Sequence, residues 1–231
     1  MSFLTQSIAA AGNLIVGGDA ELWTVVRVTL VVCGSSTAIA SVLGIPAGLA
    51  LAFTEFRGKR LSITVLNTLL ALPTVVVGLV VYAFLSRRGV LGPWGLLYTQ
   101  RAMVIGQVIL VLPLCAALAM SAVSRLDPRY RQTALTLGAG PARAAAKVAW
   151  EARFALVAAV AASFGRVIAE VGVAMMLGGN VKGFTRTMTT AMALEYDKGE
   201  FTLAIALGIV LLALSFGVNA LVHLFQGRMR T

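Results

Sequence analysis

The composition of this chain excludes an ordinary soluble domain. Its 231 residues are 59% hydrophobic and only 12% charged, whereas soluble domains are usually nearer half apolar and a quarter charged. A net charge of +10 would suit nucleic acid, but the basic residues lie in loops that flank apolar stretches, as in polytopic membrane proteins. We therefore predict a membrane protein and exclude nucleic acid as a partner.

The first residues form a segment of their own. Residues 3–16 are apolar but too short to cross the roughly 30 Å of hydrocarbon in a bilayer, and Gly17-Gly18-Asp19 separates them from the next apolar stretch. We predict an N-terminal interfacial segment over 1–20 and a single transmembrane domain over 21–231. A disordered leader is the alternative for the first segment.

Five longer apolar stretches follow, each near the ~20 residues that a spanning helix needs. Lipid offers no hydrogen-bond partner to an open strand edge, so helices are predicted throughout, and the fold class is all-α. Pro46, Pro73 and Pro113 fall within the first three stretches, and each is expected to kink its helix. The predicted spans are 22–53, 61–85, 102–123, 154–177 and 201–224.

The distribution of basic residues predicts the orientation. Lysine and arginine are concentrated in 54–60, in 125–153 and at Arg228 and Arg230, so the positive-inside rule places these segments in the cytoplasm. The remaining loops hold fewer basic residues and several acidic ones. The sequence therefore predicts an N-terminus outside and a C-terminus in the cytoplasm.

A polar, basic loop, Leu126–Arg153, joins the third and fourth predicted spans. A helical run in it should end at Gly138, because glycine adopts the left-handed conformation that closes a helix. Pro141 can then occupy the first turn of a second helix, where its missing N–H costs nothing. We interpret this helix–turn–helix as a docking element for a cytoplasmic partner, since a simple connection would not need it.

Arg166 and Glu170 lie four residues apart within the predicted fourth span, so they should share one helix face, away from either helix end. A lone charge at mid-bilayer costs about 3 kcal/mol, and the pair should therefore face protein or water. Two interpretations remain open. The pair lines a translocation route in which Arg166 attracts an anion, or it is a neutralised pair that braces the bundle.

The end of the fourth predicted span and the loop after it are rich in glycine and polar residues. The glycines permit close approach and break the helix, and the polar donors beside positive charge suit a tetrahedral oxyanion or an outer receptor surface. An ordinary solvated loop is the alternative. Met175 and Met176 would form a pliable constriction or simply pack. The glycines are Gly172, Gly178, Gly179 and Gly183, and the polar residues are Asn180, Lys182, Thr185, Arg186, Thr187, Thr189 and Thr190.

No catalytic, cofactor or metal site is predicted. Cys33 and Cys115 lie in apolar segments and are interpreted as small buried hydrophobes. The single histidine, His223, offers no metal constellation and is expected to be interfacial or packed. The sequence lacks a Gly-x-x-x-x-Gly-Lys-Ser/Thr motif, so ATP hydrolysis is not expected in this chain.

The loop also resembles a known element, the EAA loop of the membrane subunits of ABC importers. That pattern reads Glu-Ala-Ala, three residues, Gly, nine residues, and Ile-x-Leu-Pro. Its places are taken here by Gln132-Thr133-Ala134, Gly138 and Val148, while Trp150-Glu151 stands where the pattern has Leu-Pro.

Other stretches are similar to the molybdate and tungstate permeases of this importer class, and to tungstate permeases in particular. They are Leu72–Leu79, Leu112–Leu114, Phe164–Gly172, Gly178–Asn180 and Gly183–Thr187. The resemblance covers nearly the whole chain.

This resemblance implies a function and its partners. Two copies would form the pathway, each docked on one subunit of a cytoplasmic ABC ATPase dimer, and an extracytoplasmic binding protein would deliver tungstate. The implied ATPase-coupling residues are Arg131, Gln132, Thr133, Ala134, Gly138, Ala139, Pro141 and Arg143. The implied pathway or gate residues are Arg166, Glu170, Met175, Met176, Asn180, Thr185, Arg186 and Thr187.

Three alternatives remain. Molybdate and sulfate share the shape and charge of tungstate, so a molybdate or sulfate permease fits almost as well. An ATP-independent anion channel or carrier would often show repeated halves, which are not evident here. A non-transporting scaffold would not need a charged pair inside a span.

Overall fold

Helices form every regular element of the part of the chain that the structure, a computed structural model, describes: residues 3–127 and 129–227. The all-α prediction is confirmed for these residues. The long helices are α2 (Ala20–Phe53), α5 (Gln100–Ser124) and α11 (Phe201–Gly227). The others are α1 (Phe3–Val16), α3 (Lys59–Leu70), α4 (Thr74–Leu85), the short 3-10 helix η1 (Gly92–Trp94), α6 (Arg129–Thr136), α7 (Pro141–Glu151), α8 (Arg153–Ile168), α9 (Gly172–Gly178) and α10 (Met188–Lys198).

Three single helices among the described residues are long and apolar enough to cross a membrane. They are α2, α5 and the stretch Phe201–Leu224 of α11. Two bent pairs, α3 with α4 and α7 with α8, raise the number to as many as five if each pair is one span. The first, third and fifth predicted spans are therefore continuous helices. The first bent pair falls within the second predicted span, whereas the second bent pair begins in the loop that precedes the fourth.

The second predicted span is broken where the sequence suggested only a kink. Its two halves, α3 and α4, meet at an angle of 98°, and Pro73 immediately precedes α4. Proline lacks an N–H and disfavours helical geometry at the residue before it. Pro46 and Pro113, by contrast, lie within the unbroken helices α2 and α5.

The expectation of a continuous helix over 154–177 is wrong, because α8 ends at Ile168 and α9 begins at Gly172. The Glu170 side chain accepts a hydrogen bond from the Val173 N–H in the first turn of α9, at 3.2 Å. A carboxylate that satisfies a free N–H favours the start of a new helix there. Arg166 consequently lies in the last turn of α8 and Glu170 in the break that follows, not in a helix interior as expected.

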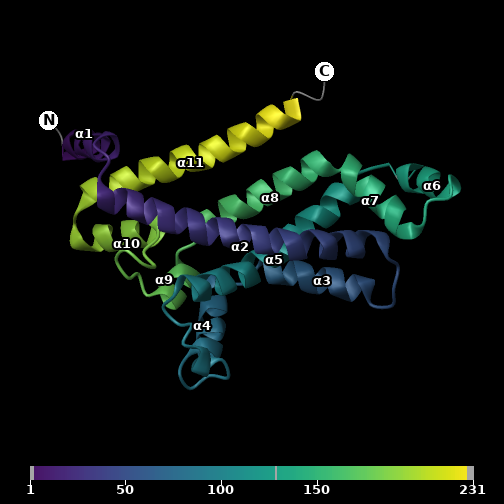
Figure 1. The fold of residues 1–231 in the computed structure, drawn as a ribbon, viewed down its shortest axis with the longest axis horizontal. Helices are drawn as coiled ribbons and strands as arrows, with labels where there is room; N and C mark the ends of the chain where they lie inside the picture. The colour runs from purple at the N-terminus through teal and green to yellow at the C-terminus, as the bar shows by residue number, and fades with distance from the viewer. Residues whose placement is uncertain (1–2, 128, 228–231) are drawn as a thin grey trace.

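Helices α2 and α5 pack along each other at the centre of the bundle (Figure 1). A Cβ at Gly48 of α2 would overlap the Ala116 carbonyl oxygen of α5, so glycine permits this close approach. The buried Ser36 hydroxyl donates to the Gln107 side-chain oxygen across the same interface, at 2.9 Å. Close contact and a buried polar pair together set the register of the two helices.

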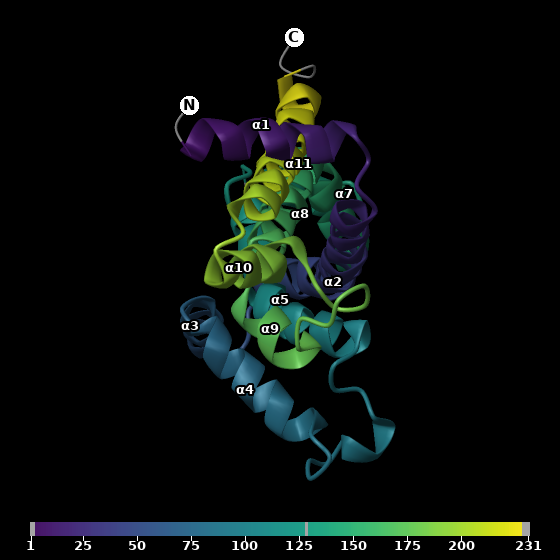
Figure 2. The same cartoon turned by 90° about the vertical axis from the view of Figure 1, so that its left-hand side faces the viewer.

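The N-terminal segment is helical and packs against α11, which it crosses in Figure 2. Ala11 of α1 is fully buried there. Asp19 ends the segment by accepting the Leu22 N–H at the start of α2, at 2.8 Å, which is an N-cap. The placement of 1–20 at a membrane interface stays a prediction. Cys33 and Cys115 are buried free thiols.

Candidate functional site

The candidate residues lie toward opposite ends of the bundle. The elbow, by which we mean residues 129–151 with helices α6 and α7, lies at one end, on the right of Figure 1. Helices α9 and α10 lie toward the other. The structure therefore separates the residues assigned to docking from those assigned to the pathway.

The turn of the elbow has the predicted geometry. Gly138 adopts a φ of +84°, in the left-handed region. The Gly138 N–H donates to the Leu135 carbonyl and the Ala139 N–H to the Ala134 carbonyl, both at 3.0 Å, which satisfies the last carbonyls of α6. Pro141 is the first residue of α7. The prediction that Gly138 closes one helix and Pro141 opens the next is confirmed.

The elbow is joined directly to the long helices. Val148 and Ala152 are buried with Val123 at the end of α5, and Phe53 at the end of α2 packs on them. The Arg131 guanidinium lies 5.7 Å from the centroid of the Phe53 ring, within the range of a cation–π contact. A force on the elbow would therefore reach α2 and α5 without a flexible linker.

Most of the predicted docking residues lie on the exposed surface of the elbow. Leu137, at the tip of the turn, is 82% exposed and was not among them. Its exposure could have been predicted from the sequence, because Leu137 is a large apolar residue beside the turn glycine in a polar loop. Gln132, Thr133, Gly138, Pro141 and Arg143 are exposed, whereas Arg131, Ala134 and Ala139 are half-buried.

The predicted pair forms an ion pair, with Arg166 Nη1 lying 2.8 Å from Glu170 Oε2. The Glu170 side chain is 3% exposed and that of Arg166 is 41% exposed. Thr189 of α10 donates to the Glu170 carbonyl at 2.8 Å, and the Glu170 carboxylate holds the first turn of α9 through Val173. Glu170 thus joins three helices, while Arg166 reaches the surface.

The two helix breaks face each other at this point. A Cβ at Gly172 would lie 2.9 Å from the Thr74 hydroxyl oxygen and 3.4 Å from Glu170 Oε1. Thr74 is the first residue of α4. Both interruptions and the ion pair therefore share one region of the bundle, a juxtaposition that the sequence did not reveal.

The two methionines of α9 differ in their surroundings. A Cβ at Gly78 of α4 would lie 2.8 Å from the Met176 sulfur, so Met176 packs closely against α4. Met175 is 36% exposed. Only Met175 therefore projects from the packed face, and its role in a constriction stays a prediction.

The predicted threonines use their hydroxyls inside the protein. Thr185 donates to the Gly178 carbonyl at 2.6 Å and accepts the Val181 N–H at 3.0 Å. Thr187 and Thr190 form a capping box at the start of α10, the reciprocal arrangement that satisfies two free N–H groups. These bonds shape the loop, and direct contact of the threonines with an anion stays a prediction.

Asn180 and Arg186 lie in the same loop. Asn180 has a φ of 52° and donates to the Thr190 carbonyl at 3.3 Å. Arg186 lies 3.5 Å from Glu21 Oε1, and Lys182 lies 2.7 Å from Glu21 Oε2. Glu21, at the start of α2, therefore pairs with both basic residues of the loop and offsets part of their charge, a long-range pairing that sequence reasoning missed.

Known proteins are similar to this chain over most of its length. Residues 44–231 match the family described as binding-protein-dependent transport system inner membrane component. The tungstate uptake system permease protein TupB of Peptoclostridium acidaminophilum is 40% identical over 98% of this chain and 99% of its own length. A probable anion ABC transporter permease protein of Haloferax volcanii is 42% identical over 91% of this chain and 94% of its own.

Solved structures share the fold. The MetNI methionine ABC transporter in inward-facing conformations aligns with a TM-score of 0.68 at 18% identity, covering 89% of this chain and 92% of the other. A bacterial ABC transporter that imports alginate aligns with a TM-score of 0.77 at 14% identity, covering 100% of this chain and 91% of the other. Taken with the family match over 44–231, these likenesses lead to one conclusion: the chain belongs to the binding-protein-dependent transport system inner membrane components.

Proposed function

We propose that this chain is the membrane subunit of an ATP-driven ABC importer for a tetrahedral oxyanion, and that the ion is tungstate. The observation that carries the proposal is 40% identity, over nearly the full length, to tungstate uptake permeases of two bacteria, Peptoclostridium acidaminophilum and Campylobacter jejuni. The sulfate permease CysT of Escherichia coli and a putative molybdenum permease of Bacillus subtilis are 28% and 26% identical. We therefore assign tungstate, rather than molybdate or sulfate, as the transported ion.

The proposed topology has five spans, with the N-terminus outside and the C-terminus in the cytoplasm. The spans are α2, α3 with α4, α5, α8 with α9, and α11. The elbow carries Arg129, Arg131, Arg143 and Lys147, which supports a cytoplasmic position. Arg228 and Arg230, which also entered the charge argument, lie outside the described residues.

The elbow is the proposed site of coupling. Two copies of the chain would each present Leu137 and the neighbouring exposed residues to one subunit of an ATPase dimer. ATP would bind one state of that dimer more tightly, and this difference in affinity would shift the permease between its two conformations. The packing of Val148 and Phe53 supports direct transmission, because it joins the elbow to α5 and α2.

The region where the helix breaks meet is the proposed pathway, and a binding protein would dock at that end of the bundle. Arg166 is partly exposed while Glu170 is buried and retains a second donor in Val173. A passing dianion could therefore pair with the arginine without leaving the carboxylate unsatisfied. A charge inside the membrane is costly and usually marks a substrate or ion pathway.

Reconstitution tests the function. The permease, its ATPase and its binding protein would be placed in lipid vesicles, and labelled tungstate uptake measured with and without ATP. We expect ATP-dependent uptake that excess sulfate does not abolish. Uptake without ATP would favour a carrier, and preferential uptake of molybdate or sulfate would change the assigned ion.

Neutral variants test the pathway. Arg166→Gln with Glu170→Gln retains hydrogen-bonding groups but removes both charges, so we expect assembly to be preserved and uptake to fall at least about tenfold, or ~1.4 kcal/mol of barrier. Glu195 and Lys198 of α10 form a matched buried-to-exposed pair at 2.9 Å, and their double glutamine variant should transport normally. Normal uptake by the first double variant would leave its ion pair a purely structural role.

A further inference from the structure

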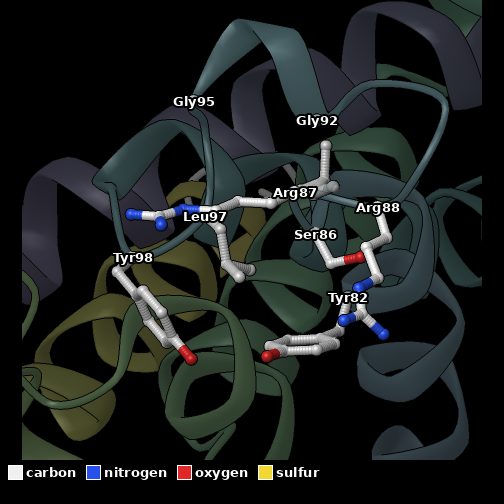
Figure 3. Close-up of a pocket in the computed structure, with 9 residues that line it drawn as sticks. Tyr82, Ser86, Arg87, Arg88, Gly92, Gly95, Leu97 and Tyr98 are labelled. Atoms are coloured by element: carbon white, nitrogen blue, oxygen red, sulfur yellow. The ribbon is translucent and has the colours of Figure 1, made fainter.

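A cavity of about 480 Å³ lies at the end of α4, and one of its walls contacts the end of α9. Its polar lining consists of Tyr82, Ser86, Arg87, Arg88 and Tyr98, which we call the arginine pocket. In Figure 3 the two tyrosine hydroxyls point toward one another, and both arginines extend from the same short stretch of chain after α4. The described lining contains no carboxylate.

The positive charge of the arginine pocket is not neutralised within the described residues. Arg87 and Arg88 are exposed and take part in none of the ion pairs found there. The loop after α9 differs, because Glu21 pairs with both Lys182 and Arg186. At this end of the bundle, therefore, Glu21 offsets part of the charge of one loop, whereas no described carboxylate pairs with the arginines of the pocket.

The wall that carries the arginines is tightly wound. The Ser86 N–H donates to the Tyr82 carbonyl at 2.8 Å, and the Gly89 N–H donates to the Ser86 carbonyl at 2.7 Å. A Cβ at Gly92 would lie 2.5 Å from the Ser86 carbonyl oxygen and 2.7 Å from that of Arg87. Backbone geometry thus holds the two arginine residues on one compact turn, from which Arg87 extends toward Tyr98 and Arg88 toward Tyr82 (Figure 3).

The opposite wall is tied to α9. Tyr98 has a φ of 62°, unusual for a residue other than glycine, and its N–H donates to the Leu177 carbonyl at 2.8 Å. Its ring packs on Gly179, where a Cβ would lie 2.7 Å away. A hydrogen bond with the Tyr82 phenol raises the pKa of Tyr98, and the neutral phenol can donate a hydrogen bond.

We propose that the arginine pocket binds one tetrahedral oxyanion at the outer surface before transit. This rests on the proposed function only for the identity of the ion and for the outward position of this end. Guanidinium groups donate two N–H groups in a fork that suits oxyanions, and the Ser86 and tyrosine hydroxyls supply further donors. Helix α9 links the pocket to Glu170 over a rise of ~10 Å, so the pocket lies one helix length from the proposed pathway.

Direct binding tests the proposal. The permease–ATPase complex, without binding protein, would be titrated with sodium tungstate by equilibrium dialysis. Arg87→Gln with Arg88→Gln should weaken binding at least about tenfold, and the double lysine variant should lose less, because it keeps the charge but not the fork. Arg101 is exposed and lies outside the lining, so Arg101→Gln should change the affinity less than about twofold. Co-purification with the ATPase would verify that each variant assembles.

Each remaining outcome is decisive. Equal affinity of the Arg87/Arg88 glutamine variant and the unmodified complex would overturn the proposal. Import of tungstate with no measurable binding in the absence of binding protein would also overturn it, while leaving the proposed function intact. Weaker binding-protein association without a change in tungstate affinity would show that the arginines dock an acidic protein surface instead. Arginine-dependent binding of sulfate with no tungstate import would support the pocket and reject the assigned ion.

Discussion

Gly138 provides the sharpest test of the elbow. Its φ is +84° and a Cβ there would meet nothing within 4 Å, so Gly138→Ala introduces backbone strain without a steric clash. A non-glycine residue in the left-handed region costs about 1–2 kcal/mol. Helix α6 has no buried residue, so tertiary packing does not hold it in place against that strain. In a fraction of the variant molecules the elbow should therefore no longer adopt the observed turn.

The expected magnitude follows from that population. If the ATPase recognises only the turned elbow, its apparent affinity falls with the fraction in that state. A cost of 1–2 kcal/mol lowers the ratio of turned to unturned elbows by about 5–30-fold, which is the largest loss of affinity expected. The dissociation constant would be measured with labelled ATPase and permease in lipid nanodiscs. Gly138→Asn should weaken binding less, because asparagine tolerates the left-handed region better than alanine.

Gly140 supplies the matched control two residues further on. Its φ is −65° and a Cβ there also meets nothing within 4 Å, so Gly140→Ala should leave the affinity within about twofold. The reasoning would be refuted if Gly138→Ala bound the ATPase as tightly as the unmodified protein. It would be equally refuted if the two alanine variants lost the same affinity.

Two further predictions concern the bundle, and thermal unfolding of the detergent-solubilised protein checks both. Gly48→Ala should destabilise by about 1–3 kcal/mol through overpacking against α5, whereas Gly34→Ala on the same helix meets nothing within 4 Å and should be neutral or slightly stabilising; a reversed order would contradict the proposed packing. The buried Thr29 hydroxyl accepts the N–H that begins α10 at 2.8 Å, so Thr29→Val should cost about 1 kcal/mol. Thr24→Val removes only a bond to the same helix and should have little effect, and equal losses from the two variants would remove the assigned role of Thr29.

The long apolar helices and the elbow were largely predictable from local sequence. Continuous apolar stretches specify spanning helices because lipid leaves backbone groups no other partner. The closure at Gly138 and the entry at Pro141 depend on the conformational preferences of single residues. Each of these signals acts over a few residues, so the helices α5 and α11 and the elbow were predicted with nearly their observed bounds.

The candidate pathway and the arginine pocket depended instead on contacts between distant segments. The break after Ile168 follows from the bonds that Glu170 makes to Arg166 and to the first turn of α9, and an apolar stretch on its own suggests no interruption there. The pairing of Glu21 with Lys182 spans 161 residues, so local sequence could not reveal which loop keeps its positive charge. Local preferences therefore determined where helices form and how the elbow turns, whereas three-dimensional packing alone decided which breaks meet and which charges stay free, because those depend on partners that the chain brings together only on folding.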